Sequence, residues 1–99
     1  MEVHVSPEAA TFVRERGGAL YLWTDDVGSA FEHDRVEFEP PEGMEVDLVW
    51  SDLFELYVER DFPLPDTVRI SFRRWPRRRL RIWWGDALWT WRGRWGGAG

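Results

Sequence analysis

Apolar and polar residues alternate along most of the chain beyond residue 35, and this pattern restricts the fold more than any other feature of the sequence. Successive side chains of a strand point to opposite faces, so an alternating segment is typical of a half-buried strand. Segments 44–50 and 53–60 alternate apolar with largely acidic residues, whereas 68–74 and 78–84 alternate apolar residues with arginine. Further strands are predicted at 3–6, 19–23, 35–39 and 87–91.

The apolar positions of these strands predict which side chains form the core. They are Val36, Phe38, Val46, Leu48, Trp50, Phe54, Leu56, Val58, Ile70, Phe72, Leu80, Ile82 and Trp84. Composition predicts a loop over 24–30 and reversals of the chain at Trp75-Pro76-Arg77 and at Gly85-Asp86.

Near the amino terminus, SPEAATFVRERGG (6–18) predicts one helix with signals at both ends. Ser6 can cap the first free amides, and Pro7 suits the first helical position. The two glycines that follow Arg16 can end the helix. A helix of about ten residues is not stable alone, so Phe12 and Val13 must pack against a sheet.

The chain has 99 residues, which is the length of one domain with one core. We expect a single domain over 1–95 and a disordered Gly-rich tail over 96–99. The predicted fold class is α+β, with one amino-terminal helix packed on mainly antiparallel strands. The amino terminus lacks the basic and long apolar segments of a secretory signal, so we expect a cytoplasmic location.

Charge is divided unequally along the chain. Residues 1–68 hold 17 acidic residues and four arginines, whereas residues 69–99 hold nine arginines and one acidic residue. The favoured interpretation is that acidic and arginine strands are neighbours, so that opposite charges meet across the sheet. The other interpretations are a nucleic-acid surface and a protein-binding face.

The candidate interaction surface lies in the arginine-rich part of the chain. Its residues are Arg73, Arg74, Trp75, Arg77, Arg78, Arg79, Arg81 and Trp83. A nucleic-acid surface would use the arginines on phosphates and would stack bases on Trp75, Trp83, Trp89 or Trp91. An overall pI near 5.0 and the absence of any nucleic-acid-binding motif count against it.

The eight tryptophans divide into two predicted groups. Trp23, Trp50 and Trp84 fall on apolar faces and are predicted to be core. Trp83, Trp91 and Trp95 are harder to bury in one small domain, and a homodimer interface would cover them.

The run VHVSPEAATFVRERGGALYLW (3–23) resembles the opening of HesB/IscA-like domains, the family of A-type iron-sulfur carriers. The segment DLFELYVERDFPLPDTVRISF (52–72) is similar to the part of that family in which a turn leads to a strand and a short acidic connection. The resemblance implies a compact, β-rich sandwich of mixed and antiparallel strands, in which iron-sulfur clusters are held by three cysteines.

This chain has no cysteine, so it lacks every ligand of that family. Val27, Gly28 or Ser29 stands where the resemblance places the first thiolate, and the segment 75–89 has no Cys-Gly-Cys pair. Apolar and hydroxyl side chains do not replace thiolates on iron. The sequence therefore predicts a divergent member that carries no cluster and binds no cofactor.

No other arrangement of residues predicts chemistry. Asp25 and Asp26 with Asp86 or Glu32 are interpreted as solvated turn residues rather than a cation site. His33 and Asp34 are sequence neighbours, which point to opposite faces of a strand and cannot form a dyad. No catalytic and no metal-binding residue is expected, and His4 has no second histidine at ligand spacing.

The sequence therefore predicts a non-catalytic binding or structural module rather than an enzyme. Its expected partner is a protein or a second copy of the chain. The alternative is a nucleic-acid-binding protein that uses the Arg/Trp-rich carboxyl-terminal strands. No membrane contact is expected.

Overall fold

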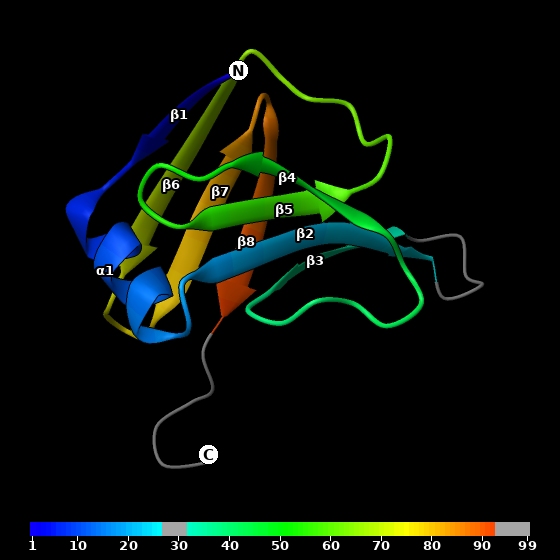
Figure 1. Cartoon of the computed structure of the whole chain (residues 1–99). Helices are drawn as coiled ribbons and strands as arrows, with labels where there is room; N and C mark the ends of the chain where they lie inside the picture. The colour runs from blue at the N-terminus through cyan, green and yellow to red at the C-terminus, as the bar shows by residue number, and fades with distance from the viewer. Residues whose placement is uncertain (27–31, 93–99) are drawn as a thin grey trace.

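A computed structural model describes residues 1–26 and 32–92, which form one helix and eight strands (Figure 1). The helix is α1 (Pro7–Glu15), and it is neither long nor apolar enough to cross a membrane. The strands are β1 (Glu2–Val5), β2 (Ala19–Asp26), β3 (Glu32–Glu37), β4 (Val46–Trp50), β5 (Glu55–Glu59), β6 (Thr67–Arg73), β7 (Arg79–Trp84) and β8 (Ala87–Arg92).

The strands form two four-stranded sheets. Sheet A has the order β1-β6-β7-β8, and sheet B has the order β3-β2-β5-β4. β1 pairs in parallel with β6, and β2 pairs in parallel with β5, whereas the other four pairings are antiparallel. The predicted α+β class is confirmed, and the sheets are mixed.

The helix begins and ends as the sequence predicts. The hydroxyl of Ser6 accepts a hydrogen bond from the amide of Ala9 at 3.2 Å, and Pro7 is the first helical residue. Gly17 follows the end of α1 with a φ of 120°, a conformation that glycine adopts without steric cost. Phe12 is buried, so the helix is held by packing against the sheets.

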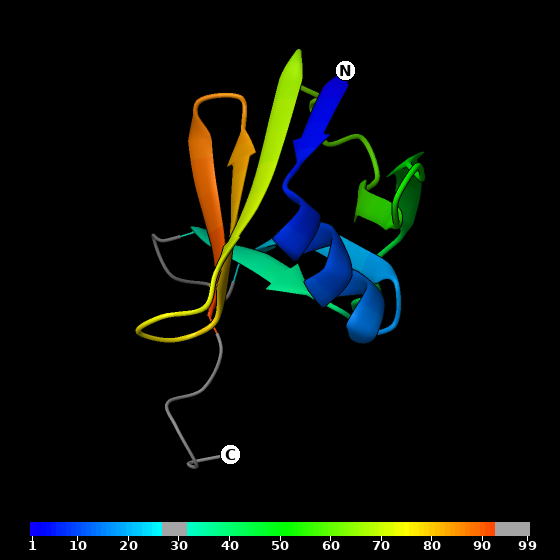
Figure 2. The same cartoon turned by 90° about the vertical axis from the view of Figure 1, so that its left-hand side faces the viewer.

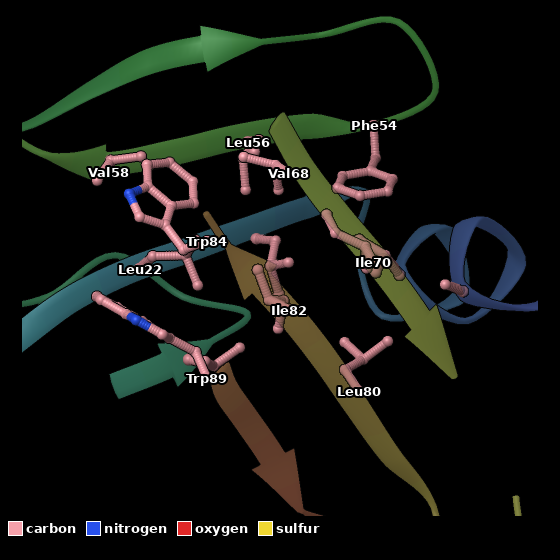
Figure 3. Packing of buried hydrophobic residues seen from close by; sticks show 14 of the residues in the cluster. Leu22, Phe54, Leu56, Val58, Val68, Ile70, Leu80, Ile82, Trp84 and Trp89 are labelled. Atoms are coloured by element: carbon pink, nitrogen blue, oxygen red, sulfur yellow. The ribbon is translucent and has the colours of Figure 1, made fainter. Parts of the chain in front are cut away.

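The core lies between the two sheets, whose apolar faces meet (Figure 3). Sheet A contributes Val68, Ile70, Leu80, Ile82 and Trp84, and sheet B contributes Leu20, Leu22, Val36, Leu56 and Val58. The indole of Trp84 donates a hydrogen bond to the carbonyl of Pro63 at 3.0 Å, so its polar atom is satisfied where its ring is buried.

Three predicted core positions are wrong. Val46 lies opposite Glu59 on the outer face of sheet B, outside the buried cluster. Leu48 is 49% exposed, because the β4–β5 register shifts between Leu48 and Trp50 and places Leu48 opposite Tyr57 on the outer face. Trp23 is half-buried on the outer face of sheet B, because it alternates with the fully buried Leu22.

Trp89 and Trp91 are held within the fold. Trp89 is 3% exposed, so it belongs to the core and cannot be a stacking platform. Trp91 is partly buried, with its ring 5.3 Å from that of Phe12 and 5.1 Å from that of Phe38. The guanidinium of Arg16 lies within 5.2 Å of these three ring centroids, a cation-π arrangement. Trp91 therefore packs without a second copy.

Parts of two predictions fall outside the described residues. The first part of the predicted loop is wrong, because β2 continues through Thr24 to Asp26, and the rest of that prediction lies outside the described residues. The predicted tail (96–99) and Trp95 also lie outside the described residues.

Leu56→Ala and Leu48→Ala form a matched pair of variants on neighbouring strands. We expect Leu56→Ala to lower the free energy of unfolding by about 2 to 5 kcal/mol, because it leaves a cavity between the sheets. We expect Leu48→Ala to lower it by less than about 1 kcal/mol, because that side chain already contacts solvent. Urea unfolding at low protein concentration measures both, and equal losses would contradict the assignment of Leu48 to the outer face.

Candidate functional site

The acidic and arginine strands belong to different sheets. β4 and β5 lie in sheet B, whereas β6 and β7 lie in sheet A, where the neighbours of β6 are β1 and β7. The predicted pairing of acidic strands with arginine strands is therefore wrong. Cross-strand charge pairs contribute only about 0.2 to 1 kcal/mol each, too little to decide which strands pair when apolar faces must be buried.

The arginine side chains of sheet A share its outer face. Residues directly opposite each other in a ladder lie on the same face. Arg69 is opposite Trp83, Ser71 is opposite Arg81, and Arg73 is opposite Arg79. Their sequence neighbours on β6 and β7 are buried against sheet B. We define the arginine surface as Arg69, Arg73, Arg79, Arg81 and Trp83.

Figure 2 shows how this surface is placed. β6, β7 and β8 form one layer, and β4 and β5 lie in the other, so the outer face of sheet A is directed away from sheet B. The strands β6 and β7 are joined by the connection 74–78, which extends beyond the end of the sheet.

A hollow of about 510 Å³ lies at one end of the arginine surface. It is lined by Asp66, Thr67, Arg69, Trp83, Gly85 and Asp86. Trp83 is 42% exposed there, although most of its neighbours on β7 are buried. Tryptophan and arginine are enriched among the residues that contribute most of the binding energy of protein interfaces. A hollow that holds an exposed indole beside a guanidinium is therefore a candidate binding site.

The eight predicted site residues divide between two places. Arg73, Arg79, Arg81 and Trp83 lie on the outer face of sheet A, as expected. Arg74, Trp75, Arg77 and Arg78 lie in the connection between β6 and β7.

Arg74 and Arg78 line a different groove. This groove, of about 420 Å³, lies against α1 and is also lined by Glu8 and Glu15. The guanidinium of Arg78 is 6.0 Å from the ring centroid of Phe12 in its floor. The predicted set also missed Arg69, although the alternation along 68–74 places it on the face of Arg73.

The arginines of this surface form no ion pair with the described part of the chain, although Asp66 and Asp86 line the hollow beside Arg69. Among the described residues, Arg60 forms ion pairs with Glu45 and Asp47, and Nε2 of His4 lies 3.5 Å from a carboxylate oxygen of Glu2. Among residues 1–26 and 32–92, neither Arg69 nor Arg81 forms an ion pair. Arg73 and Arg79 likewise have no carboxylate partner in this part of the structure, and the Nε atom of Arg79 is buried without a hydrogen-bond partner.

Only two of the four tryptophans considered as stacking platforms are exposed. Trp75 is 83% exposed in the β6–β7 connection, and Trp83 is partly exposed on the sheet. Trp89 is core, and Trp91 packs on Phe12. Two of the four tryptophans that a nucleic-acid surface was expected to use are therefore not exposed for stacking on bases.

The outer face of sheet B has an aromatic and acidic character. The rings of Tyr21 and Tyr57 are stacked, with centroids 4.7 Å apart and planes 9° apart. The Tyr57 hydroxyl donates a hydrogen bond to the carboxylate of Glu55. This hydrogen bond, with some burial and the negative charge of Glu55, raises the pKa of Tyr57.

Metal-binding clusters are not found among the described residues. The side chains of Asp25, Asp26 and Glu32 lie outside the described part of the structure, so the expectation for that acidic set is not tested. His33 and Asp34 belong to β3, but their side chains also lie outside the described part of the structure, so the expectation for this pair is not tested.

The Tyr57–Glu55 contact predicts a measurable pH dependence. The chain has two tyrosines, so in the Tyr21→Phe variant the ultraviolet absorbance of tyrosinate reports Tyr57 alone. We expect a midpoint above the ordinary 10.0, and a lower midpoint when Glu55 is changed to Gln. A raised pKa means that the stability from this bond is fully present below pH 10 and is lost as pH rises through the Tyr57 pKa. A midpoint that Glu55→Gln leaves unchanged would contradict the contact.

Comparison with known proteins yields no relative of this chain. No family model matches it, no curated protein sequence matches it, and no solved structure matches it. Its function must therefore be argued from the two sheets and their outer faces.

Proposed function

We propose that the chain is a non-catalytic protein-binding module whose arginine surface binds an acidic surface of a partner protein. One observation carries the proposal: the arginine strands form a sheet apart from the acidic strands, and their outer face has no carboxylate partners in the described part of the chain. Charged side chains that are not needed for pairing within the fold remain free to pair with another molecule.

The chemistry of the surface suits carboxylates. Arginine presents a planar fork of donors that holds a carboxylate at two points, and it loses less hydration than lysine does when an interface covers it. Trp83 supplies apolar area at the same place, next to Arg69 in the hollow. Charge complementarity would speed association and select acidic partners, while the indole would supply affinity.

A nucleic acid is the second candidate partner, favoured by the exposure of Trp75 near the arginines. Phosphates would use the same guanidinium groups, and bases would stack on Trp75 and Trp83. The whole chain has a net charge of −5, and sheet B carries acidic residues on its outer face. The part of a long polyanion that extends past the arginine surface would therefore be repelled by the rest of the molecule. An acidic protein surface of limited size fits this charge distribution better.

We also propose that the fold is HesB/IscA-like. Support comes from the order of strand, helix and strand in β1, α1 and β2, and from the mixed pairing of the sheets, which the resemblance implies. An iron-sulfur cluster does not fit this chain, because no thiolate is present to hold iron. The module would then have the fold of an iron-sulfur carrier without binding a cluster.

Binding to poly-L-glutamate tests the proposed function. We expect the fluorescence of the exposed tryptophans to change on titration at low ionic strength, with an affinity that falls as salt is added. Arg69→Ala/Arg81→Ala should weaken binding at least about tenfold, the equivalent of about 1.4 kcal/mol. The matched control is Arg14→Ala/Arg60→Ala, which removes the same charge outside the arginine surface and should bind nearly as the wild type.

A single-stranded oligothymidylate serves as the competing probe under the same conditions. Tighter binding of the oligonucleotide than of polyglutamate, lost in Arg69→Ala/Arg81→Ala, would support the nucleic-acid candidate instead. No binding of either probe at low ionic strength would refute both candidates.

Anaerobic incubation with ferrous iron and sulfide tests the absence of cluster chemistry. We expect a colourless protein after desalting, with no bound iron or sulfide, because the chain has no cysteine. A brown protein that retains iron and sulfide in fixed proportion would contradict the proposed loss of carrier activity.

A further inference from the structure

We infer that the acidic partner of the arginine surface is the outer face of sheet B on a second copy of this chain. The inference rests on the proposed function, because it names the protein partner of the same surface. It follows from the registers of both sheets, which place complementary rows of side chains on the two opposite faces of the sandwich.

The outer face of sheet B carries one continuous row across its four strands. Glu37 is opposite Tyr21, Tyr21 is opposite Tyr57, and Tyr57 is opposite Leu48. Glu55 lies beside this row, where it accepts the hydrogen bond of Tyr57. We call these five residues the tyrosine surface. It combines an exposed leucine, two stacked rings and two carboxylates.

The outer face of sheet A carries a row of matching length. His4 is opposite Arg69, Arg69 is opposite Trp83, and Trp83 is opposite Leu88. Arg81 lies in the next row, opposite Ser71. The centre of this row holds Arg69 and Trp83 where the row on sheet B holds two tyrosines, and the cations Arg69 and Arg81 lie on this face where Glu37 and Glu55 lie on the other.

The two surfaces therefore complement each other in charge and in apolar content. Arg69 and Arg81 can receive Glu37 and Glu55, and the hollow beside Trp83 can receive the apolar part of the tyrosine surface. The exposed fractions of Leu48 and Leu88, 49% and 38%, would fall on contact, and water would be released from both. A buried aromatic centre with charge pairs around it is the usual anatomy of a specific interface.

The size of the molecule is sufficient for such a contact. Its extents are 34 × 32 × 25 Å, so either flat side can offer the roughly 800 Å² per partner of a standard interface. Figure 2 shows β6, β7 and β8 on one side of the molecule and β4 and β5 on the other, while β3 of sheet B crosses close to β8 of sheet A. One copy can therefore use both faces at once.

This geometry sets the kind of assembly. The contact joins two different surfaces, so it is a heterologous interface rather than a two-fold symmetric one. Copies would stack head to tail, into an open row or a closed ring, and the assembly would grow with protein concentration. Screening by salt would weaken it, because the charge pairs at its rim are accessible to ions.

Paired charge reversals test the inference. Arg69→Glu/Arg81→Glu makes both faces acidic, and Glu37→Arg/Glu55→Arg makes both faces basic. We expect the wild type to sediment well above its 11.8 kDa monomer mass at hundreds of micromolar protein and low salt, and to return to the monomer in high salt. Each variant alone should remain monomeric, and an equimolar mixture of the two should associate again, because every contact then joins opposite charges.

The matched control is Arg14→Glu/Arg74→Glu, which changes net charge by the same amount outside both surfaces and should associate as the wild type does. Urea unfolding of each variant confirms that it is folded. A wild type that stays monomeric in low salt, a reversed variant that still associates alone, or a mixture that stays monomeric would overturn the inference. The polyglutamate titration decides the proposed function separately, because a monomer that binds polyglutamate through Arg69 and Arg81 would lose only the inference.

Discussion

Burial of one apolar face of each sheet against the other is the constraint on which the remaining structure depends. Leu22, Leu56, Ile70 and Ile82 meet between the layers, and α1 adds Phe12 to the same core. Removal of these side chains from water contributes about 1.5 to 3 kcal/mol for each large residue, more than a surface charge pair. The strands are therefore arranged to close this core, and the positions of charged residues follow from that arrangement.

Charge segregation is a consequence of this arrangement. Because β6 pairs with β1 and β7, and β5 pairs with β2 and β4, arginines collect on one outer face while Glu37 and Glu55 lie on the other. A chain with a net charge of −5 thus presents a cationic surface of several arginines. The net charge does not reveal this surface, because charges of opposite sign cancel in the total even when they lie on different sheets.

The sequence predicts the elements of this fold better than their pairing. The start of the helix at Ser6 and Pro7 depends only on residues that are close in sequence. The same is true of the alternation at Leu80, Ile82 and Trp84. The partner of each strand depends on the whole core, so the placement of acidic beside arginine strands was wrong. Leu48 was misassigned because a register shift in β4 reverses the alternation, and Trp89 was misassigned because its burial depends in part on Phe62, which is distant in sequence.

The lack of cysteine limits which part of the family resemblance can carry function. The cluster ligands of that family are thiolates, whereas a core position needs only apolar volume, so a similar core does not require the ligands to be present. Substitutions on the outer faces of the sheets do not disturb the core, because residues such as Arg69 and Tyr57 lie on the opposite side of their strands. The outer faces of the two sheets can therefore change in sequence without loss of the packing that stabilises the fold.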